Sequence, residues 1–262
     1  MNNKQNLAGN KHISDLLKSR EELENLVEVS FFIPCLNEED SIIFTLNKVV
    51  SIARDLNITF ELLVYNDGSI DKTKEIVENY IINHPGVLIK TVNRTERKGL
   101  GYNYVDGAFL GLGKYYMMIC GDNSETEESI REILKRKGTA DIIIPYFGHL
   151  DSRSFLRRNL SKLFTGIVNF LSGHKINYYN GVVLHLRKNV MRWHPMSIGF
   201  AYQAELLTIM LDENKSCTQV LISNNDREKG FSRAFYFLNF LSVAHSLLQI
   251  LFRRVRRAIT PK

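Results

Sequence analysis

The chain has 262 residues, of which 44% are hydrophobic and 24% are charged, so it is not an intrinsically disordered protein and can form one large domain. Its net charge of +6 suits nucleotide phosphates, phospholipid headgroups or nucleic acid without choosing among them. Cys35, Cys120 and Cys217 are far apart and form no CxxC pair, which argues against a disulfide framework or a zinc site and favours a reducing compartment.

Strands and helices are predicted to alternate through the first half of the chain. Residues 1–26 are expected to form a polar leader ending in a short charged helix, without an apolar signal core. The elements predicted next are strands over 27–34, 60–65, 87–92, 115–120 and 141–144, and helices over 38–56, 72–83, 101–111 and 126–137. This alternation predicts an α/β fold with a mostly parallel central sheet flanked by helices.

The second half is less regular. Its predicted elements are a helix over 155–171, a strand over 178–186, a helix over 201–211 and a strand over 216–222. Because no internal repeat or low-complexity linker is found, residues 27–232 are interpreted as one domain.

Residues 233–262 are predicted to form an amphipathic, basic C-terminal helix. Asn239, Ser242, Ser246, Gln249, Arg253 and Arg256 recur at helical spacing and give one polar stripe, with apolar residues on the other faces. The pattern favours a helix lying in a membrane interface, with Arg253, Arg254, Arg256 and Arg257 near anionic lipid. A helix packed on the domain and a membrane-spanning helix are the alternatives.

Polar turns follow the first, second and fourth predicted strands. In a parallel sheet such turns meet at the carboxyl ends of the strands, where ligands bind. In the second turn, the carboxylate of Asp67 could accept hydrogen bonds from a base or a ribose, although a plain Asp-Gly turn is equally consistent with the sequence. In the third turn, Asp122 could hold Mg²⁺ or Mn²⁺ against a diphosphate, or belong to an acidic helix start with Glu125, Glu127 and Glu128.

The order of the motifs is more specific than any one of them. PCLNEED, VYNDGSIDKT and RKGLGYNYVDGAFLGLGKYYMMICGDNS are followed by NGVVLHLRKNV, GFAYQAELL and REKGFSRAF. Over about residues 27–235 this series resembles the family-two glycosyltransferases, which have the GT-A fold. The later motifs are most similar to polyprenyl-phosphate glycosyltransferases such as dolichol-phosphate mannose synthase.

The resemblance implies a role for each matching position. The nucleotide-sugar site would contain Pro34, Asn37, Glu38, Asn66, Asp67, Lys98, Gly99 and Gly121. The catalytic residues would be Asp122, Glu205 and Arg227, and the metal would be held by Asp122 and Ser124. Ser232, in the same R-x-x-G-x-S element as Arg227, would bind the acceptor phosphate.

Two positions depart from the family pattern. Asn66 replaces the first Asp of the D-D-G-S turn, and Cys120 replaces the first Asp of the D-x-D metal motif. Because Mg²⁺ prefers oxygen ligands, either Asp122 holds it with Asn123, Ser124 or Glu125 and water, or metal dependence is weakened. A degenerate, inactive member of the family is the remaining alternative.

The activity predicted is inverting transfer of a sugar from a nucleotide-sugar donor to a polyprenyl phosphate. It is expected at the cytoplasmic face of the plasma membrane, with the protein attached peripherally through its C-terminal helix. An ionised acceptor phosphate needs no strong base, and cations should lie near it; Arg153, Arg157 and Arg158 are candidates, although they could also form a solvated basic face.

Two alternatives remain open. Transfer to a hydroxyl of a surface polysaccharide or lipid-linked glycan would need a base, for which Glu205 is the candidate. A non-catalytic nucleotide-binding module belongs to another class. Nucleic acid is not an expected partner, because the basic residues do not interleave with aromatic ones. A homo-oligomer is compatible with the apolar C-terminal face.

Overall fold

The computed structural model describes residues 20–193, 201–223 and 237–259, except for the side chains of 237–242. The strands are β1 (Val29–Cys35), β2 (Phe60–Asp67), β3 (Ile89–Arg94), β4 (Tyr115–Met118), β5 (Ile142–Tyr146), β6 (Leu184–Leu186) and β7 (Cys217–Leu221). The helices are α2 (Ile42–Asp55), α3 (Thr73–Asn83), α4 (Leu100–Leu110), α5 (Glu127–Lys135), η1 (Gly148–Leu150), α6 (Phe155–Ser172), α7 (Arg187–Val190), α8 (Tyr202–Asp212) and α9 (Phe237–Ile259). Residues 20–26 are also helical.

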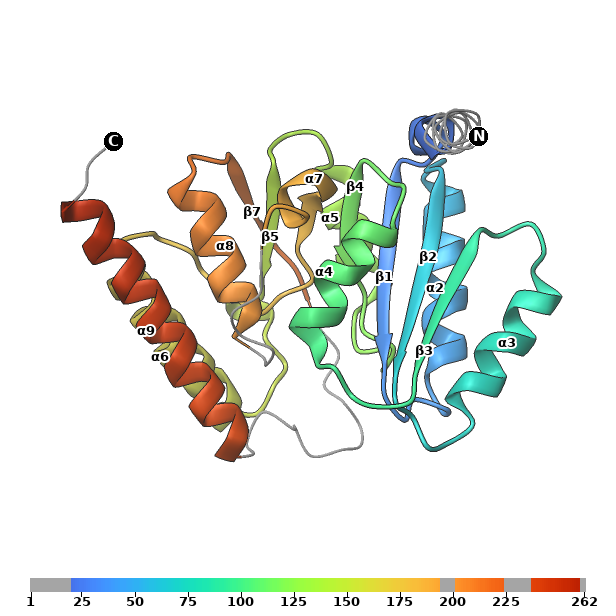
Figure 1. The fold of residues 1–262 in the computed structure, drawn as a ribbon, viewed down its shortest axis with the longest axis horizontal. Coiled ribbons are helices and arrows are strands. Elements are labelled where there is room, and N and C mark those ends of the chain that lie inside the picture. Colours follow the sequence, from blue (N-terminus) through green and yellow to red (C-terminus); the bar gives the residue numbers. More distant parts are fainter. Residues whose placement is uncertain (1–19, 194–200, 224–236, 260–262) are drawn as a thin grey trace, which may run out of the picture.

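The seven strands form one sheet in the order β3-β2-β1-β4-β6-β5-β7 (Figure 1). β1 pairs in parallel with β2 and β4, and β2 with β3, while β6 runs antiparallel to both of its neighbours. The predicted α/β fold with a mostly parallel central sheet is therefore confirmed. Since β1 lies between β2 and β4, the loops that follow these three strands emerge at the same edge of the sheet.

Helices cover both faces of the sheet. Alternate residues of β1 point to opposite faces, so Phe31 and Ile33 pack with α2, α3 and α5, whereas Phe32 packs with α4 and α8. Burial on both faces explains why β1 reads as an almost continuous apolar run. The two buried layers hold the polar loops at a fixed edge.

Two predicted boundaries are wrong for a physical reason. The strand predicted over 178–186 is regular only at Leu184–Leu186, because polar groups of 177–181 bond to side chains instead of a neighbouring strand. The helix predicted from Glu38 begins at Ile42, because residues 39–41 form a turn in which the Ser41 amide donates to the Glu38 carbonyl at 3.1 Å.

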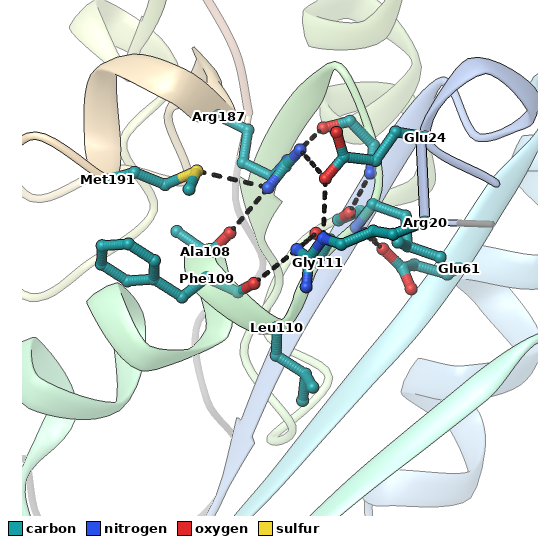
Figure 2. A network of polar contacts seen from close by, with 12 residues as sticks. Arg20, Glu24, Glu61, Ala108, Phe109, Leu110, Gly111, Arg187 and Met191 are labelled. Carbon is teal, nitrogen blue, oxygen red and sulfur yellow. Dashed lines mark hydrogen bonds and ion pairs between the residues drawn. The ribbon is translucent and has the colours of Figure 1, made fainter. Parts of the chain in front are cut away.

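The helical residues 20–26 are attached to the domain through a buried arginine. Figure 2 shows the guanidinium of Arg187 between Glu24 and the end of α4. Arg187 is 8% exposed; it donates to the carbonyls of Gly113 (2.7 Å) and Ala108 (3.1 Å) and to Glu24 Oε1 (2.9 Å). The cation thus satisfies carbonyls at and beyond the negative end of α4.

The C-terminal helix α9 packs on α6 and α8 (Figure 1). Ser246 and Ile250 are each 1% exposed. Arg253 Nε donates to Asp212 Oδ2 at 2.8 Å, and Arg257 also donates to Asp212 on α8. The polar stripe predicted from the sequence therefore faces the domain along part of its length.

A third arginine of the predicted lipid-binding cluster also contacts protein. Arg254 donates to the carbonyls of Phe170 and Leu171 at the end of α6, where the last carbonyls of a helix lack partners within it. Within the described ranges, no helix is both long enough and apolar enough to cross a bilayer.

Candidate functional site

The loops after β1 and β2 are bonded to each other. Asn37 lies in the left-handed region with φ 57°. Its amide donates to Ser69 Oγ at 2.9 Å, and its side-chain oxygen accepts from the amide of Ile70 at 2.9 Å. Two hydrogen bonds of Asn37, a predicted nucleotide-site residue, thus join the loop after β1 to the loop that contains the Asp-Gly-Ser turn.

Asn66 is 5% exposed at the end of β2. Its oxygen accepts from the amide of Ser69 (3.0 Å), and its nitrogen donates to Asn93 Oδ1 on β3 (3.2 Å). An ionised aspartate could only accept hydrogen bonds. Asn66, where the family pattern has Asp, therefore provides both the acceptor for Ser69 and the donor for Asn93, which an ionised aspartate could not.

Asp67 fixes the loop that leads into α4. Its two carboxylate oxygens accept from the amides of Lys98 (2.9 Å) and Gly99 (3.1 Å). Gly99 precedes the helix at φ 90°, a conformation that favours glycine. The structure thus brings together three of the predicted nucleotide-site residues, with Lys98 contributing its backbone.

The loop after β4 closes against the end of β1. Gly121 is buried, and a Cβ there would lie 2.9 Å from the carbonyl oxygen of Pro34 and 3.1 Å from Cys35 Cβ. The Gly121 carbonyl accepts from Ser41 Oγ at 3.0 Å and from Thr45 Oγ1 at 3.2 Å. Only glycine fits this contact without displacing β1, so the chain after β4 is held beside the β1 loop.

Cys35, at the end of β1, lies beside these loops, and their negative charge affects the pKa of its thiol. Burial, followed by the negative charges of Glu38, Asp71 and Asp67, raises the pKa of the Cys35 thiol to about 12. Carboxylates at the ends of β1 and β2 therefore raise the pKa of the same residue, Cys35, against which Gly121 packs. Such concentrated negative charge favours a bound cation or a ligand with hydrogen-bond donors.

A group of metal-ligand type follows β4. One ligand atom from each of Cys120, Asp122 and Glu125 lies within 4.8 Å of the other two. The amide of Ser124 donates to Asp122 Oδ1 at 3.1 Å, which orients the carboxylate. The two carboxylates offer oxygen ligands that suit Mg²⁺ or Mn²⁺, whereas the thiol suits Mg²⁺ poorly, and Glu125 could provide the second carboxylate that position 120 lacks.

From the sequence, Glu125 is only one of several candidates for a further metal ligand. Burial raises the pKa of its carboxyl group, while hydrogen bonds involving Cys120 and the charge of Lys48 lower it. Lys48 on α2 also donates to the Glu125 carbonyl at 2.6 Å. Sequence spacing gave no sign of Lys48, because the contact spans 77 positions.

The predicted acceptor-phosphate residues lie at the start of α6. Arg153 donates from Nε and Nη2 to both oxygens of Asp151 (2.8 and 2.7 Å) and from Nη1 to the Tyr178 hydroxyl (3.0 Å). Burial raises the pKa of Tyr178, the charge and the hydrogen bond of Arg153 lower it, and the charges of Asp151 and Cys120 add smaller increases.

The other two arginines of this run, Arg157 and Arg158, are half-buried, and Arg158 donates to the Asp151 carbonyl at 3.1 Å. The run is therefore not a fully solvated face, and its role toward phosphate stays a prediction.

Glu205 lies in the core on α8. It is 1% exposed, and its Oε1 accepts from the indole nitrogen of Trp193 at 3.4 Å. The predicted residues Arg227 and Ser232 lie outside the described residues. The structure thus leaves the predicted acceptor side of the site partly undescribed.

A hollow of about 970 Å³ lies at the opposite edge of the sheet. It is lined by Glu28, Lys114, Asp141 and Ser216, among others, and by none of the predicted site residues. We assign the candidate active site to the other edge, because ligands of such sheets bind beyond the carboxyl ends of the strands.

The sheet and its acidic loops define an α/β nucleotide-binding protein of the GT-A class. The sequence profile of glycosyl transferase family 2 matches residues 30–194, and the chain belongs to this family.

Similar proteins include transferases acting on lipid phosphates. A dolichyl-phosphate beta-glucosyltransferase of Dictyostelium discoideum is 25% identical, over 91% of this chain and 78% of that protein. An undecaprenyl-phosphate 4-deoxy-4-formamido-L-arabinose transferase of Photorhabdus laumondii is 21% identical, over 87% and 69%. A dolichyl-phosphate beta-glucosyltransferase of Trichomonas vaginalis is 26% identical over 54% of this chain, which spans only 44% of that relative.

Solved structures share the fold. Glucosyl-3-phosphoglycerate synthase of Mycobacterium tuberculosis, in complex with Mn²⁺, UDP-glucose and phosphoglyceric acid, superposes with a TM-score of 0.61. The identity is 18%, and the match covers 89% of this chain and 82% of the synthase. At this identity the likeness supports the GT-A fold alone.

Proposed function

We propose that the protein transfers a sugar from a nucleotide-sugar donor to a polyprenyl phosphate, with inversion at the anomeric carbon. The observation that carries the proposal is the meeting of the loops after β1, β2 and β4 around Cys35, with Asp67 at the end of β2 and Asp122 in the loop after β4. Membership of glycosyl transferase family 2 supports the donor, and the lipid-phosphate relatives support the acceptor.

The donor would bind along the carboxyl ends of these strands. Asp67 holds the amides of Lys98 and Gly99, so its carboxylate shapes the loop that would receive the nucleotide. Asp122, Glu125 and Cys120 would hold Mg²⁺ or Mn²⁺, which neutralises charge on a departing diphosphate when bound. The M. tuberculosis synthase, whose structures with UDP contain either ion, supports this choice.

The acceptor phosphate would approach from the side of Arg153. The guanidinium is fixed by Asp151 and Tyr178, which orients it at little entropic cost for binding a phosphate. Since a phosphate oxygen is already ionised, it can attack the sugar without a general base.

Transfer to a sugar hydroxyl is less well supported. It requires a base, and Glu205 is buried and accepts a hydrogen bond from Trp193. We place the proposed reaction at the cytoplasmic face of the plasma membrane; the three cysteines are free, in keeping with a reducing compartment.

The test offers the purified chain labelled uridine, guanosine and thymidine diphosphate sugars together with Mn²⁺. One reaction contains a detergent-dispersed polyprenyl monophosphate, and a second contains sugar and glycolipid acceptors without phosphate. We expect labelled, organic-soluble product only in the first, with a ³¹P signal of a sugar phosphodiester. Asp122→Asn is the matched inactive control.

Product formed only on hydroxyl acceptors would overturn the proposed acceptor. Absence of product with every donor, despite nucleotide binding, would favour the non-catalytic alternative.

A further inference from the structure

The side chain of Cys120 has a position set by the sheet. The amide of Ile119 donates to the Phe32 carbonyl at 2.9 Å. The amide of Gly121 donates to the Pro34 carbonyl at 3.1 Å, so the chain stays bonded to β1 beyond the end of β4. Because successive residues of an extended chain point to opposite faces, the Cys120 side chain lies on the face that packs with α4 and α8. The sulfur therefore stays beside the carboxylates that follow it.

The two carboxylates next to this sulfur are also fixed. The amide of Ser124 donates to Asp122 Oδ1 at 3.1 Å, and Lys48 on α2 donates to the Glu125 carbonyl at 2.6 Å. A side-chain hydrogen bond joins Glu125 to Cys120. Oε2 of Glu125 is shielded from solvent and has no hydrogen-bond partner among the described residues. A buried anionic oxygen in this state favours a bound cation.

One sulfur and two carboxylates discriminate among divalent ions. Mg²⁺ prefers a shell of oxygen ligands and gains little from a thiolate. Zn²⁺ and Co²⁺ accept sulfur and oxygen ligands together, and Mn²⁺ is the weakest binder of the first-row transition ions. A single cysteine with two carboxylates is also a different kind of site from the CxxC type that the cysteine spacing argues against. The affinity of this group should therefore rise from Mg²⁺ through Mn²⁺ to Co²⁺ and Zn²⁺.

We propose that Cys120 is a thiolate ligand and that the group of Cys120, Asp122 and Glu125 selects a transition-metal ion that accepts sulfur over Mg²⁺. On binding, one metal–sulfur bond forms and the thiol proton passes to solvent. The inference rests on the proposed function only in placing the ion where the donor diphosphate would bind. It names the class of ion, which the proposed function leaves open.

The test is a titration of the reduced, metal-free full chain with Co²⁺ alone, followed by absorption. A cobalt–thiolate bond gives an intense charge-transfer band in the near ultraviolet, which carboxylate ligands do not give. We expect this band to saturate at an equimolar amount of Co²⁺. Cys120→Ser, which exchanges sulfur for oxygen, should abolish the band and weaken Co²⁺ binding at least about tenfold. Cys217→Ser, at an exposed cysteine on β7, is the matched control and should keep the band.

Competition measures the selectivity. Zn²⁺ should displace Co²⁺ and remove the band at a nearly equimolar amount, whereas Mg²⁺ in about hundredfold excess should leave it in place. Circular dichroism and thermal unfolding confirm that each variant is folded. Co²⁺ bound to the wild type without the band, or a band that persists in folded Cys120→Ser, would overturn the proposal. So would displacement by Mg²⁺ as readily as by Zn²⁺.

The titration contains neither donor nor acceptor, so its result is independent of sugar transfer. A band that only Cys120→Ser removes, in a chain that transfers no sugar to any acceptor, would support the thiolate ligand and reject the proposed activity. Sugar transfer in a chain that shows no band would support the activity and reject the ligand.

Discussion

Asp67 connects a strand end to the start of a helix through two backbone amides. An aspartate at this position can accept from both amides at once, whereas an asparagine offers one oxygen. The loop from β3 to α4 is thus fixed by a side chain of β2, and a nucleotide binding at this edge would meet a preformed surface.

We therefore expect Asp67→Asn to weaken binding of the preferred nucleoside diphosphate about tenfold, because one amide of the loop loses its partner and the loop must be ordered on binding. Isothermal titration calorimetry measures the change. Asp55→Asn, which removes an exposed pairing with Arg131, is the control and should leave the affinity unchanged. Equal affinities for wild type and Asp67→Asn would contradict the assigned role.

Cys120 is the residue at which this chain departs from an all-oxygen metal site. A thiol suits Mg²⁺ poorly, so Cys120→Asp should tighten Mg²⁺ binding in the presence of the nucleotide by about tenfold. The measurement is a calorimetric titration with Mg²⁺, and Cys217→Asp, at an exposed position on β7, is the control. If Cys120→Asp leaves the Mg²⁺ affinity as it was, position 120 is not a ligand.

Strand β6 contains a buried histidine that makes the stability of the folded chain depend on pH. His185 on this strand is fully buried, and neither ring nitrogen has a hydrogen-bond partner among the described residues. Burial lowers the pKa of His185 from 6.5 to about 3. His185 is therefore protonated below pH 6.5 in the unfolded chain, but only below about pH 3 in the folded chain. The free energy of unfolding thus falls as the pH drops from 6.5 to about 3.

For His185 alone the loss between pH 7 and pH 5 should be about 2 kcal/mol. His185→Leu removes the titrating group, so its free energy of unfolding should fall by that much less over the same range. Urea unfolding at the two pH values provides the measurement. His149→Leu, at an exposed position, should keep the wild-type difference; a His185→Leu variant that also kept it would refute the explanation.

The helical residues 20–26 depend on a planar guanidinium. Arg187 reaches two backbone carbonyls and Glu24 at once (Figure 2). A lysine keeps the charge but cannot match this fork, so Arg187→Lys should cost about 3 kcal/mol of stability.

Hydrogen exchange of Arg187→Lys should show faster exchange at residues 20–26 and at the end of α4, while urea unfolding gives the stability change. Arg131→Lys, in a surface pair with Asp55, should cost less than about 1 kcal/mol. Unchanged exchange at residues 20–26 would show that the arginine does not hold this segment.

At the scale of the whole molecule, the sequence predicts the parallel part of the sheet well. Strong apolar runs such as β1 and β2 are followed by polar turns, and both features depend only on neighbouring residues. The strand predicted over 178–186 contains β6, but its late start at Leu184 could not be predicted, because residues 177–181 bond to side chains distant in the sequence, as Asn177 does to Gln219. For the same reason, the contact of Lys48 with Glu125 and the contacts of Arg187 could not be predicted from the sequence.

The candidate site, too, contains some residues that the sequence predicts and others that it does not. Asp67 and Asp122 are predictable because each belongs to a motif at or just beyond the carboxyl end of a predicted strand. Glu125 acquires its place only when the chain folds back at Asn123, with φ 59°, so that its carboxylate meets Cys120. The basic cluster of α9 was assigned to lipid from its charge, yet Arg253 and Arg257 bind Asp212, a partner more than 40 positions away.

The central claim is that the loops after β2 and β4 form one site for a nucleoside diphosphate and a divalent cation. A thermal-shift panel of nucleoside diphosphates with and without Mn²⁺ tests it most directly, because a ligand that binds the folded state raises the melting temperature. We expect a nucleotide-dependent rise in the melting temperature that Mn²⁺ increases and that Asp67→Asn reduces. Asp122→Ala should abolish the part of the rise that depends on Mn²⁺. A rise unaffected by either substitution, or no rise with any nucleotide, would contradict the central claim.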